Sequence, residues 1–354
     1  MTTTIWATIF VLGVLIFVHE LGHFLVAKWA GIKVERFSLG FPPKMIGKQI
    51  GETDYCISWL PLGGYVKMAG ESPDEPTTGD PREFMSKPVG VRSLVILAGP
   101  AMNFIAAVLI FIGVLWLHGR DMPDPAQVVV GPFVASGPAD KVGIKTGDII
   151  VAVDHQHVGN FDSMARLIHG KPGDTVEVLW KHSGDIFSAR IRTRVDTAKT
   201  TDGRDTVVGI IGIGMGYITQ KVGFADAVSG GLKQTGDFCV EMVKFLGGLL
   251  SGSISIKNVS GPVGIAQIAG RVAREGWAVL LSFMAVLSLN LALLNVLPVP
   301  ILDGGHLVFL LFEKLRGRPL SMRQRTVAQQ VGLVLLLLLI VTVTYHDIVR
   351  FITG

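Results

Sequence analysis

Long apolar runs separated by polar segments dominate this chain of 354 residues. Pro298 and Pro300 interrupt the end of the third run, and a broken helix at membrane depth is tolerated only where protein or a water-filled cavity surrounds it. The pattern predicts a polytopic α-helical membrane protein with four transmembrane helices, since a span takes roughly 20 apolar residues. The four runs cover about 5–28, 94–117, 277–297 and 327–345.

Between the second and third apolar runs, apolar and polar residues alternate with a shorter period. Apolar and polar residues alternate over 176–180 and 187–194, and a Gly-Asp turn at 147–148 precedes another alternating stretch. Short strands and tight turns produce this pattern, so a β-rich domain is expected over roughly 124–195. The stretch SGPADKVGIKTGDIIVAVD at 136–154 resembles a PDZ domain of the bacterial, circularly permuted type. A generic β-rich domain is the alternative.

The PDZ resemblance implies an inserted α+β domain whose groove accepts an extended peptide ligand by strand addition. Residues 224–250, which follow it, have the pattern of an amphipathic helix that lies on a membrane surface. A glycine-rich stretch at 252–270 is expected to form a loop before the third span.

Composition agrees with the membrane class. Only 17% of the residues are charged and the mean hydropathy is +0.50, which is too apolar for an ordinary soluble protein. The net charge of +4 is small, and no basic stripe or nucleic-acid motif is present, so nucleic acid is excluded as a partner. The two cysteines, Cys56 and Cys239, cannot build a disulfide framework.

The placement of basic residues predicts the orientation in the membrane, because Lys and Arg gather in cytoplasmic loops. The interval 28–92 holds nine Lys or Arg residues, and the interval 304–326 holds five against the single acid Glu313. Both intervals are therefore expected in the cytoplasm. Both termini and the PDZ-like domain are then expected on the outer side.

The first apolar run contains HELGH at 19–23, an H-E-x-x-H pattern. On a helix, His19 and His23 lie one turn apart on one face and can both bind a single Zn²⁺. Glu20 can then take a proton from the attacking water and deliver it to the leaving amine. Chance occurrence is the alternative, but two His and one Glu are costly in an apolar span unless they are paired or coordinated. We therefore expect a zinc site with Glu20 as its general base.

A catalytic zinc takes three protein ligands and keeps one open position, so another span should supply the third ligand. Asp303, within NVLPVPILDGG at 295–305, is the only carboxylate in that apolar context. His306 is the alternative ligand, or else a residue at the start of a cytoplasmic helix. We favour Asp303, because the two glycines after it let the backbone approach closely.

Together these motifs resemble the site-2 protease family of intramembrane zinc metalloproteases, and more narrowly its bacterial type that regulates sigma-E. The resemblance covers nearly the whole chain. The chain is long enough for only one PDZ-like domain, whereas some members of the family carry two. Beyond HELGH and NVLPVPILDGG the resemblance rests on FSLGF at 37–41, PLGGYVKMAGE at 61–71, GPAMN at 99–103, VSGPVGIAQ at 259–267 and SLNLALLN at 288–295.

The resemblance implies further site residues. Asn290 and Asn295 match asparagines that engage the substrate backbone, and Asn295 is also a candidate to stabilise the oxyanion. Ordinary interhelical hydrogen bonding is the alternative for both. PLGGYVKM matches a membrane-re-entrant β-hairpin that pairs with an unwound substrate as an added strand. Its expected substrate-binding residues are Gly63, Gly64, Tyr65, Val66, Lys67 and Met68.

The resemblance also implies the substrates and the location. Expected substrates are single-pass membrane proteins already shortened on the outer side, such as anti-sigma factors, and remnants of signal peptides. The expected location is the inner membrane of a bacterium, with periplasmic termini and the active site towards the cytoplasm.

The predicted organisation combines the apolar runs with these implied parts. It has a first transmembrane helix at 1–28, a cytoplasmic-side segment with the re-entrant hairpin at 29–92, a second helix at 93–118, a periplasmic PDZ domain at 119–200, an amphipathic helix and gating loop at 201–275, a third helix at 276–303, a cytoplasmic loop or helix at 304–326, a fourth helix at 327–346 and a periplasmic tail at 347–354.

Two other functions are consistent with parts of the sequence. A non-catalytic scaffold could use zinc structurally while presenting a PDZ domain, but a structural site has no use for Glu20. A metal transporter could also carry His and Asp inside the membrane. It would need polar groups along several spans, and the second and fourth offer almost none.

Overall fold

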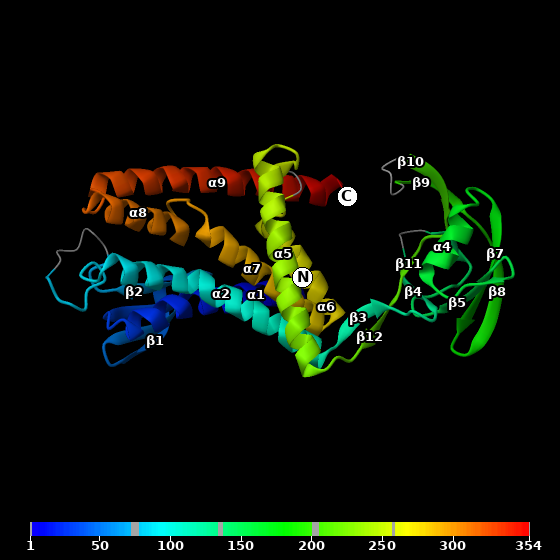
Figure 1. The fold of residues 1–354 in the computed structure, drawn as a ribbon, viewed down its shortest axis with the longest axis horizontal. Coiled ribbons are helices and arrows are strands. Elements are labelled where there is room, and N and C mark those ends of the chain that lie inside the picture. The colour runs from blue at the N-terminus through cyan, green and yellow to red at the C-terminus, as the bar shows by residue number, and fades with distance from the viewer. Residues whose placement is uncertain (1, 72–77, 134–136, 200–204, 257–258, 354) are drawn as a thin grey trace. The chain divides into compact units, whose positions relative to one another are not determined.

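The computed structural model describes residues 2–71, 78–133, 137–199, 205–256 and 259–353. The chain divides into two compact units (Figure 1). The first joins Met1–Leu117 to Gly223–Gly354, and the second is the inserted stretch His118–Val222. Each unit is described by itself below.

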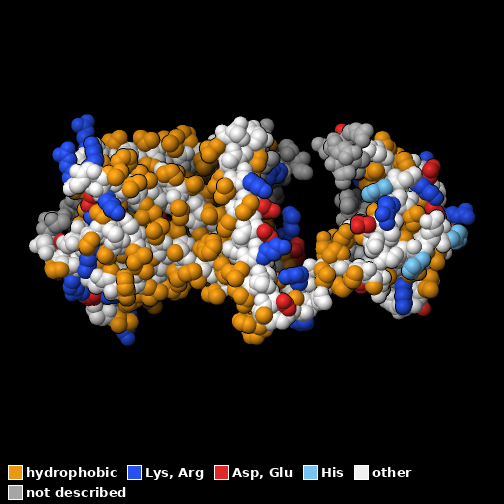
Figure 2. All heavy atoms as spheres, in the orientation of Figure 1, with side chains coloured by type: hydrophobic (Ala, Val, Ile, Leu, Met, Phe, Trp, Pro, Cys, Tyr) orange, Lys and Arg blue, Asp and Glu red, His pale blue; other side chains and the backbone are white. Residues whose placement is uncertain are grey.

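Four helices of the first unit are long and apolar enough to cross a membrane, as the sequence predicts. Figure 2 shows hydrophobic side chains over much of the visible face of this unit, with Lys and Arg gathered where α8 and α9 are joined. The chain is a membrane protein. The four helices are α1 (Thr2–Trp29), α2 (Val89–Leu117), α7 (Trp277–Val296) and α9 (Met322–Thr353).

The third span is interrupted as the sequence predicts, since α7 ends at Val296, near the end of the apolar run at 277–297. A new helix, α8 (Asp303–Arg316), begins at the last residue of the predicted interval 276–303. Pro298 and Pro300 explain the break, since proline cannot donate a helical hydrogen bond and disfavours the helical conformation of the residue before it. Asp303 therefore stands in the first turn of α8.

Helices α1 and α2 approach closely near the middle of the unit. A Cβ atom on Gly22 would lie 2.2 Å from the carbonyl oxygen of Ala98, so only glycine permits this contact. On its other side α2 packs against α7, where Phe111, Ala285 and Leu289 are buried together. This packing brings the polar residues of three helices into reach of one another.

Strands β1 (Val34–Ile50) and β2 (Thr53–Met68) form an antiparallel sheet. Each strand bends and contributes two segments, because Leu39 pairs with both Gly64 and Ile57 while Ile46 also pairs with Ile57. The segments therefore lie in the order 44–50, 53–60, 34–41 and 63–68. The stretch PLGGYVKM, which by resemblance matches a re-entrant β-hairpin, contributes residues 63–68 as the edge segment of this sheet.

The turn of this sheet is tied to the rest of the unit by charge. Glu52 accepts hydrogen bonds from Arg82 and from Lys28, the latter at 2.9 Å. These two cations lower the pKa of Glu52 to about 2. The carboxylate stays ionised at any physiological pH, so this connection does not switch with pH.

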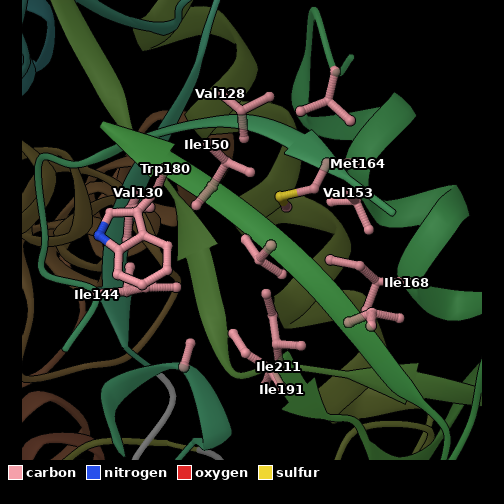
Figure 3. Close-up of a cluster of buried hydrophobic side chains, with 14 residues drawn as sticks. Val128, Val130, Ile144, Ile150, Val153, Met164, Ile168, Trp180, Ile191 and Ile211 are labelled. Atoms are coloured by element: carbon pink, nitrogen blue, oxygen red, sulfur yellow. The ribbon is translucent and has the colours of Figure 1, made fainter. Parts of the chain in front are cut away.

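The second unit is built on an antiparallel sheet in the order β11–β4–β5–β7–β8, with β6 paired to β5. Figure 3 shows its core, where Val128, Ile150, Met164, Trp180 and other apolar side chains are buried together. Its helices are α3 (Pro138–Lys141) and α4 (Phe161–His169). Its strands are β3 (Arg120–Pro123), β4 (Val128–Phe133), β5 (Ile149–Val153), β6 (Gln156–His157), β7 (Thr175–His182), β8 (Asp185–Arg192), β9 (Arg194–Lys199), β10 (Asp205–Ile210), β11 (Ile213–Met215) and β12 (Tyr217–Gln220).

This unit extends further along the chain than the predicted interval 119–200. Strand β11 pairs with β4, and β12 pairs with β3, so the two ends of the unit are joined by backbone hydrogen bonds. The first part of the predicted interval 201–275 therefore belongs to the inserted unit. Such pairing joins residues about 90 positions apart, which local alternation does not show.

The segment that returns to the membrane helices forms α5 (Phe224–Leu250) and α6 (Pro262–Glu275). The first matches the predicted helix at 224–250, but residues 262–270, predicted as loop, are helical. Pro262 suits the first turn of a helix. In addition, the carboxylate of Asp347, on α9, accepts the Gly264 N–H at 2.8 Å. A negative charge at a helix N-terminus is stabilising, and the sequence gives no sign of this distant partner.

Candidate active site

A cavity of about 520 Å³ opens inside the first unit. Its wall combines α1, α2, α8 and α9 with the edge segment of β2. The residues with polar or ionisable chemistry on this wall include His19, Glu20, His23, Glu71, Arg92, Asp303, His306 and Arg325.

His19, His23 and Asp303 meet at this cavity. The Nε2 atoms of the two histidines are 3.2 Å apart. The carboxylate oxygens of Asp303 lie 3.1 Å from His19 Nε2 and 3.7 Å from His23 Nε2. One ligand atom from each residue falls within 4.8 Å of the others, and among the described residues no other cluster of His, Cys, Asp or Glu does so.

The possible ligand atoms of this cluster lie within hydrogen-bond distance of His19 Nε2 or close to it. His23 Nδ1 lies 2.8 Å from the Val95 carbonyl oxygen, which can only accept, so Nδ1 carries the proton and Nε2 presents a lone pair. The Asp303 Oδ2 atom is buried and has no hydrogen-bond partner. A bound cation would satisfy these atoms, and two imidazole nitrogens with one carboxylate are a donor set that suits Zn²⁺.

Glycines make room for the cluster. A Cβ atom on Gly99 of α2 would lie 2.3 Å from His23 Nε2, and one on Gly304 would lie 2.2 Å from the Val296 carbonyl oxygen. The first lets α2 pass directly behind the histidine rings. The second lets the first turn of α8 fold back on the end of α7, which carries Asp303 towards α1.

A buried ion pair holds α8 against α2. The Arg92 Nη2 atom donates to Glu313 Oε1 at 2.5 Å, and Nη1 donates to Oε2 at 3.2 Å. Arg325 of α9 lies 3.6 Å from the same carboxylate. Because removing one partner of a buried pair typically costs about 3–5 kcal/mol, this contact fixes the helix that carries Asp303.

Glu20 lies beside the cluster but outside it. Its side chain borders the cavity and faces the edge segment of β2, where a Cβ atom on Gly64 would come within 2.9 Å of Glu20 Cγ. The chain can therefore hold a carboxylate next to the site of a cation without using that carboxylate as a ligand.

The residues expected to bind substrate divide into two groups. Gly64, Tyr65, Val66 and Met68 line the cavity, whereas Gly63 and Lys67 do not. Lys67 instead pairs with Glu35 at 3.0 Å.

The two expected asparagines also differ. Asn295 Nδ2 lies 3.5 Å from His19 Nε2, at the cluster itself. Asn290 has a buried Oδ1 atom without a partner, and no described contact brings its side chain to the cluster. His306, the alternative ligand, borders the cavity and packs edge-on against Phe309, outside the cluster.

Sequence reasoning missed one residue at the cluster. Asn103 of α2 is fully buried, and its Nδ2 atom lies 3.3 Å from His19 Nδ1. The sequence feature that could have indicated Asn103 is its position as a lone amide within the second apolar run, in the GPAMN stretch.

Comparison with known proteins identifies the family. A model of peptidase family M50 matches residues 7–339. The chain belongs to peptidase family M50. Zinc metalloprotease RasP of Geobacillus kaustophilus is 31% identical over 97% of this chain and 97% of its own length. A protein of Agrobacterium fabrum, provisionally named a zinc metalloprotease, is 34% identical over 96% of this chain and 94% of its own length.

Membership of family M50 confirms the predicted resemblance to site-2 proteases. The chain is a zinc metalloprotease, and zinc is its metal. For the inserted unit, the PDZ domain of an SdrC-like protein from Listeria innocua shares 29% identity over 25% of this chain and 92% of that domain. The TM-score of 0.21 is too low to establish a common fold.

Proposed function

We propose that this M50 peptidase hydrolyses peptide bonds within the transmembrane segments of single-pass membrane proteins. One observation carries the proposal. In the cluster, His19 and His23 come from one candidate membrane span, α1, and Asp303 comes from α8, the helix that follows another span, α7. Ionisable residues inside a span are costly and mark function, and a cavity beside them leaves room for a substrate.

In the proposed mechanism, His19, His23 and Asp303 hold the metal. When bound, zinc acts as a Lewis acid and makes water a nucleophile near neutral pH. Glu20 takes a proton from the water that attacks the substrate carbonyl carbon. It then gives this proton to the amide nitrogen as the C–N bond breaks, which releases a carboxylic acid and an amine; at neutral pH the acid proton passes on to the amine. The amide of Asn295, 3.5 Å from His19 Nε2, is a candidate donor to the substrate carbonyl oxygen.

The edge segment of β2, residues 63–68, is the proposed substrate-binding strand. It pairs with β1 on one side, and among the described residues no strand pairs with its other side. That free edge borders the cavity next to Glu20. A transmembrane helix hides its peptide bonds, so the substrate must unwind, and an edge strand holds the extended form.

Photocrosslinking tests this strand. A photoreactive phenylalanine at position 65, in a chain made inactive by Glu20→Gln, is expected to crosslink to the substrate. The same group at position 59 is the control, because Trp59 is 63% exposed but lies in the other half of β2. Equal crosslinking at both positions would reject the edge-strand model.

We also propose that the chain lies in a bacterial inner membrane with the active site towards the cytoplasm. Nine basic residues in 28–92 and five in 304–326 support this orientation. Both segments belong to the unit that holds the cavity, and Arg92 and Arg325 border it.

Cysteine labelling tests the orientation. In a chain with both native cysteines replaced by Ser, Asp185→Cys, at the exposed start of β8 in the inserted unit, is expected to react with an impermeant maleimide outside spheroplasts. Arg318→Cys, an exposed position between α8 and α9, is expected to react only after the membrane is opened. Labelling of Arg318→Cys from outside would invert the topology.

The inserted unit is proposed to be a PDZ domain that binds an extended peptide. The stretch 136–154 supports this, together with a sheet joined at its edge by β11 and flanked by α4. Binding of labelled peptides to the full-length chain, with loss of binding when this unit is deleted, is the measurement that checks it.

The proposed substrates are single-pass proteins already shortened on the outer side, of the anti-sigma factor type, and signal-peptide remnants. In liposomes, the chain is expected to cut such a substrate within its apolar segment, as the masses of both products show. A zinc chelator is expected to stop the reaction, and added zinc to restore it. Cleavage confined to soluble segments would reject the intramembrane assignment without affecting the metal site.

A further inference from the structure

Asn103 is the polar neighbour of His19 that the mechanism above does not use. It lies in α2 with no exposed surface, and its Nδ2 atom is 3.3 Å from His19 Nδ1. The other end of the same amide, Oδ1, is buried and has no hydrogen-bond partner. An amide that leaves its oxygen unsatisfied beside a ring nitrogen is in the less favourable of its two orientations, because an unpaired buried acceptor typically costs about 1–3 kcal/mol.

Exchanging the amide oxygen and nitrogen of Asn103 gives the unpaired oxygen a hydrogen-bond partner. The two atoms are distinguished by their hydrogen bonds rather than by their shape. With Oδ1 facing the ring, the Nδ1–H group of His19 donates to it, and the orphaned oxygen gains its partner. His19 Nε2 then presents a lone pair towards Asp303 and His23.

The opposite tautomer fits the structure less well. If Nε2 of His19 carried the proton, it would donate to His23 Nε2, 3.2 Å away, and Asn103 Nδ2 would donate to His19 Nδ1. Asn103 Oδ1 would then stay buried without a partner. The proton on Nε2 would also occupy the position at which His19 binds a cation.

We propose that Asn103 is a positioning residue: it accepts the Nδ1–H of His19 and so fixes the tautomer and ring orientation with which His19 binds zinc. Helix α2 would then orient both histidines, because Val95 and Asn103 lie about two turns apart on it and the Val95 carbonyl already accepts from His23 Nδ1. This inference rests on the ligand set proposed above.

The backbone around Asn103 is held in place. The Ser288 hydroxyl of α7 donates to the Asn103 carbonyl oxygen at 2.7 Å, and both residues are fully buried. The side chain therefore has little freedom to leave His19. Partners that orient a metal-bound histidine typically contribute 10–100-fold to metal affinity, and this is the effect expected of Asn103.

The test measures zinc retained by the full-length chain in detergent at graded chelator concentrations. Asn103→Leu, which keeps the branching at Cγ but has no acceptor, is expected to lower the apparent zinc affinity by about 10–100-fold. Asn103→Asp keeps an acceptor and is expected to retain zinc much better than Asn103→Leu. Ser282→Ala is the control, because it removes a hydrogen bond within α7, from the Ser282 hydroxyl to the Ala278 carbonyl oxygen, without touching Asn103 or the ring. It should retain zinc as the wild type does.

Two results would overturn the proposal: wild-type zinc retention by a folded Asn103→Leu chain, or a loss with Asn103→Asp as large as with Asn103→Leu. If Asn103→Leu does not fold, the Asn103→Asp variant decides alone. A carboxylate can accept the Nδ1–H of His19 and should preserve zinc binding. If Asn103 had only a structural role, a carboxylate could not replace its amide, and zinc binding would be lost. The Asp303→Asn chain separates the two hypotheses. If it holds zinc as tightly as the wild type, the ligand set fails, whatever Asn103 does.

Discussion

A chain in which Glu20 is replaced by Gln is expected to bind zinc as the wild type does and to cut its substrate about 10²–10⁴-fold more slowly, the usual contribution of a general base. Glutamine has nearly the same shape and still forms hydrogen bonds, but its amide cannot take a proton from water. Glu20 borders the cavity and is not among the residues of the metal cluster. Its loss should therefore affect proton transfer and leave metal binding intact.

Initial cleavage rates and zinc content are the two measurements for this variant. Glu241→Gln is the control, because it makes the same chemical change at an exposed position of α5, away from the cavity. An unchanged rate with Glu20→Gln would remove Glu20 from the mechanism. Loss of zinc together with activity would show instead that Glu20 helps to hold the metal.

Replacing Asp303 with Asn is expected to lower zinc affinity by more than about 100-fold, the upper range for groups that only orient a ligand. A neutral amide is a weaker ligand than a carboxylate, and it leaves two imidazoles to hold the ion. The buried Oδ2 atom, which has no hydrogen-bond partner, loses the charge that a cation would compensate.

Zinc content after chelator treatment measures this effect. Asp347→Asn is a matched control, because Asp347, like Asp303, has one buried carboxylate oxygen without a hydrogen-bond partner, but its other oxygen accepts from the Gly264 N–H on α6. It should keep zinc. If Asp303→Asn keeps wild-type affinity, the third ligand has been misassigned, and His306→Ala becomes the decisive variant.

Local patterns in the sequence were enough for much of this protein. The apolar runs predict the four long helices, because burial of about 20 consecutive apolar residues in lipid needs no tertiary partner. The spacing of His19 and His23 places them on one helix face by geometry alone. Asp303 could be singled out because a lone carboxylate in an apolar run is costly wherever it lies.

Contacts between distant residues had to come from the structure. Strands β11 and β12 close the inserted unit by pairing across about 90 residues. Residues 262–270 are helical, and Asp347 reaches the N-terminus of that helix from α9. The same holds for the four-segment sheet, whose edge at 63–68 depends on β1 pairing on both of its sides.

The metal site shows which residues the sequence identifies and which contacts only the tertiary structure reveals. Sequence alone named His19, Glu20, His23 and Asp303. Each has an ionisable side chain with recognisable chemistry, and each stands in an apolar stretch where an ionisable group is energetically costly. Only the tertiary structure showed that Asn103 meets His19, and that the buried Oδ1 atom of Asn290 has no hydrogen-bond partner. An asparagine in a span is equally able to hydrogen-bond any neighbouring helix. Which ring it meets is decided by how closely α1, α2 and α7 pack, and therefore by glycines such as Gly22 and Gly99.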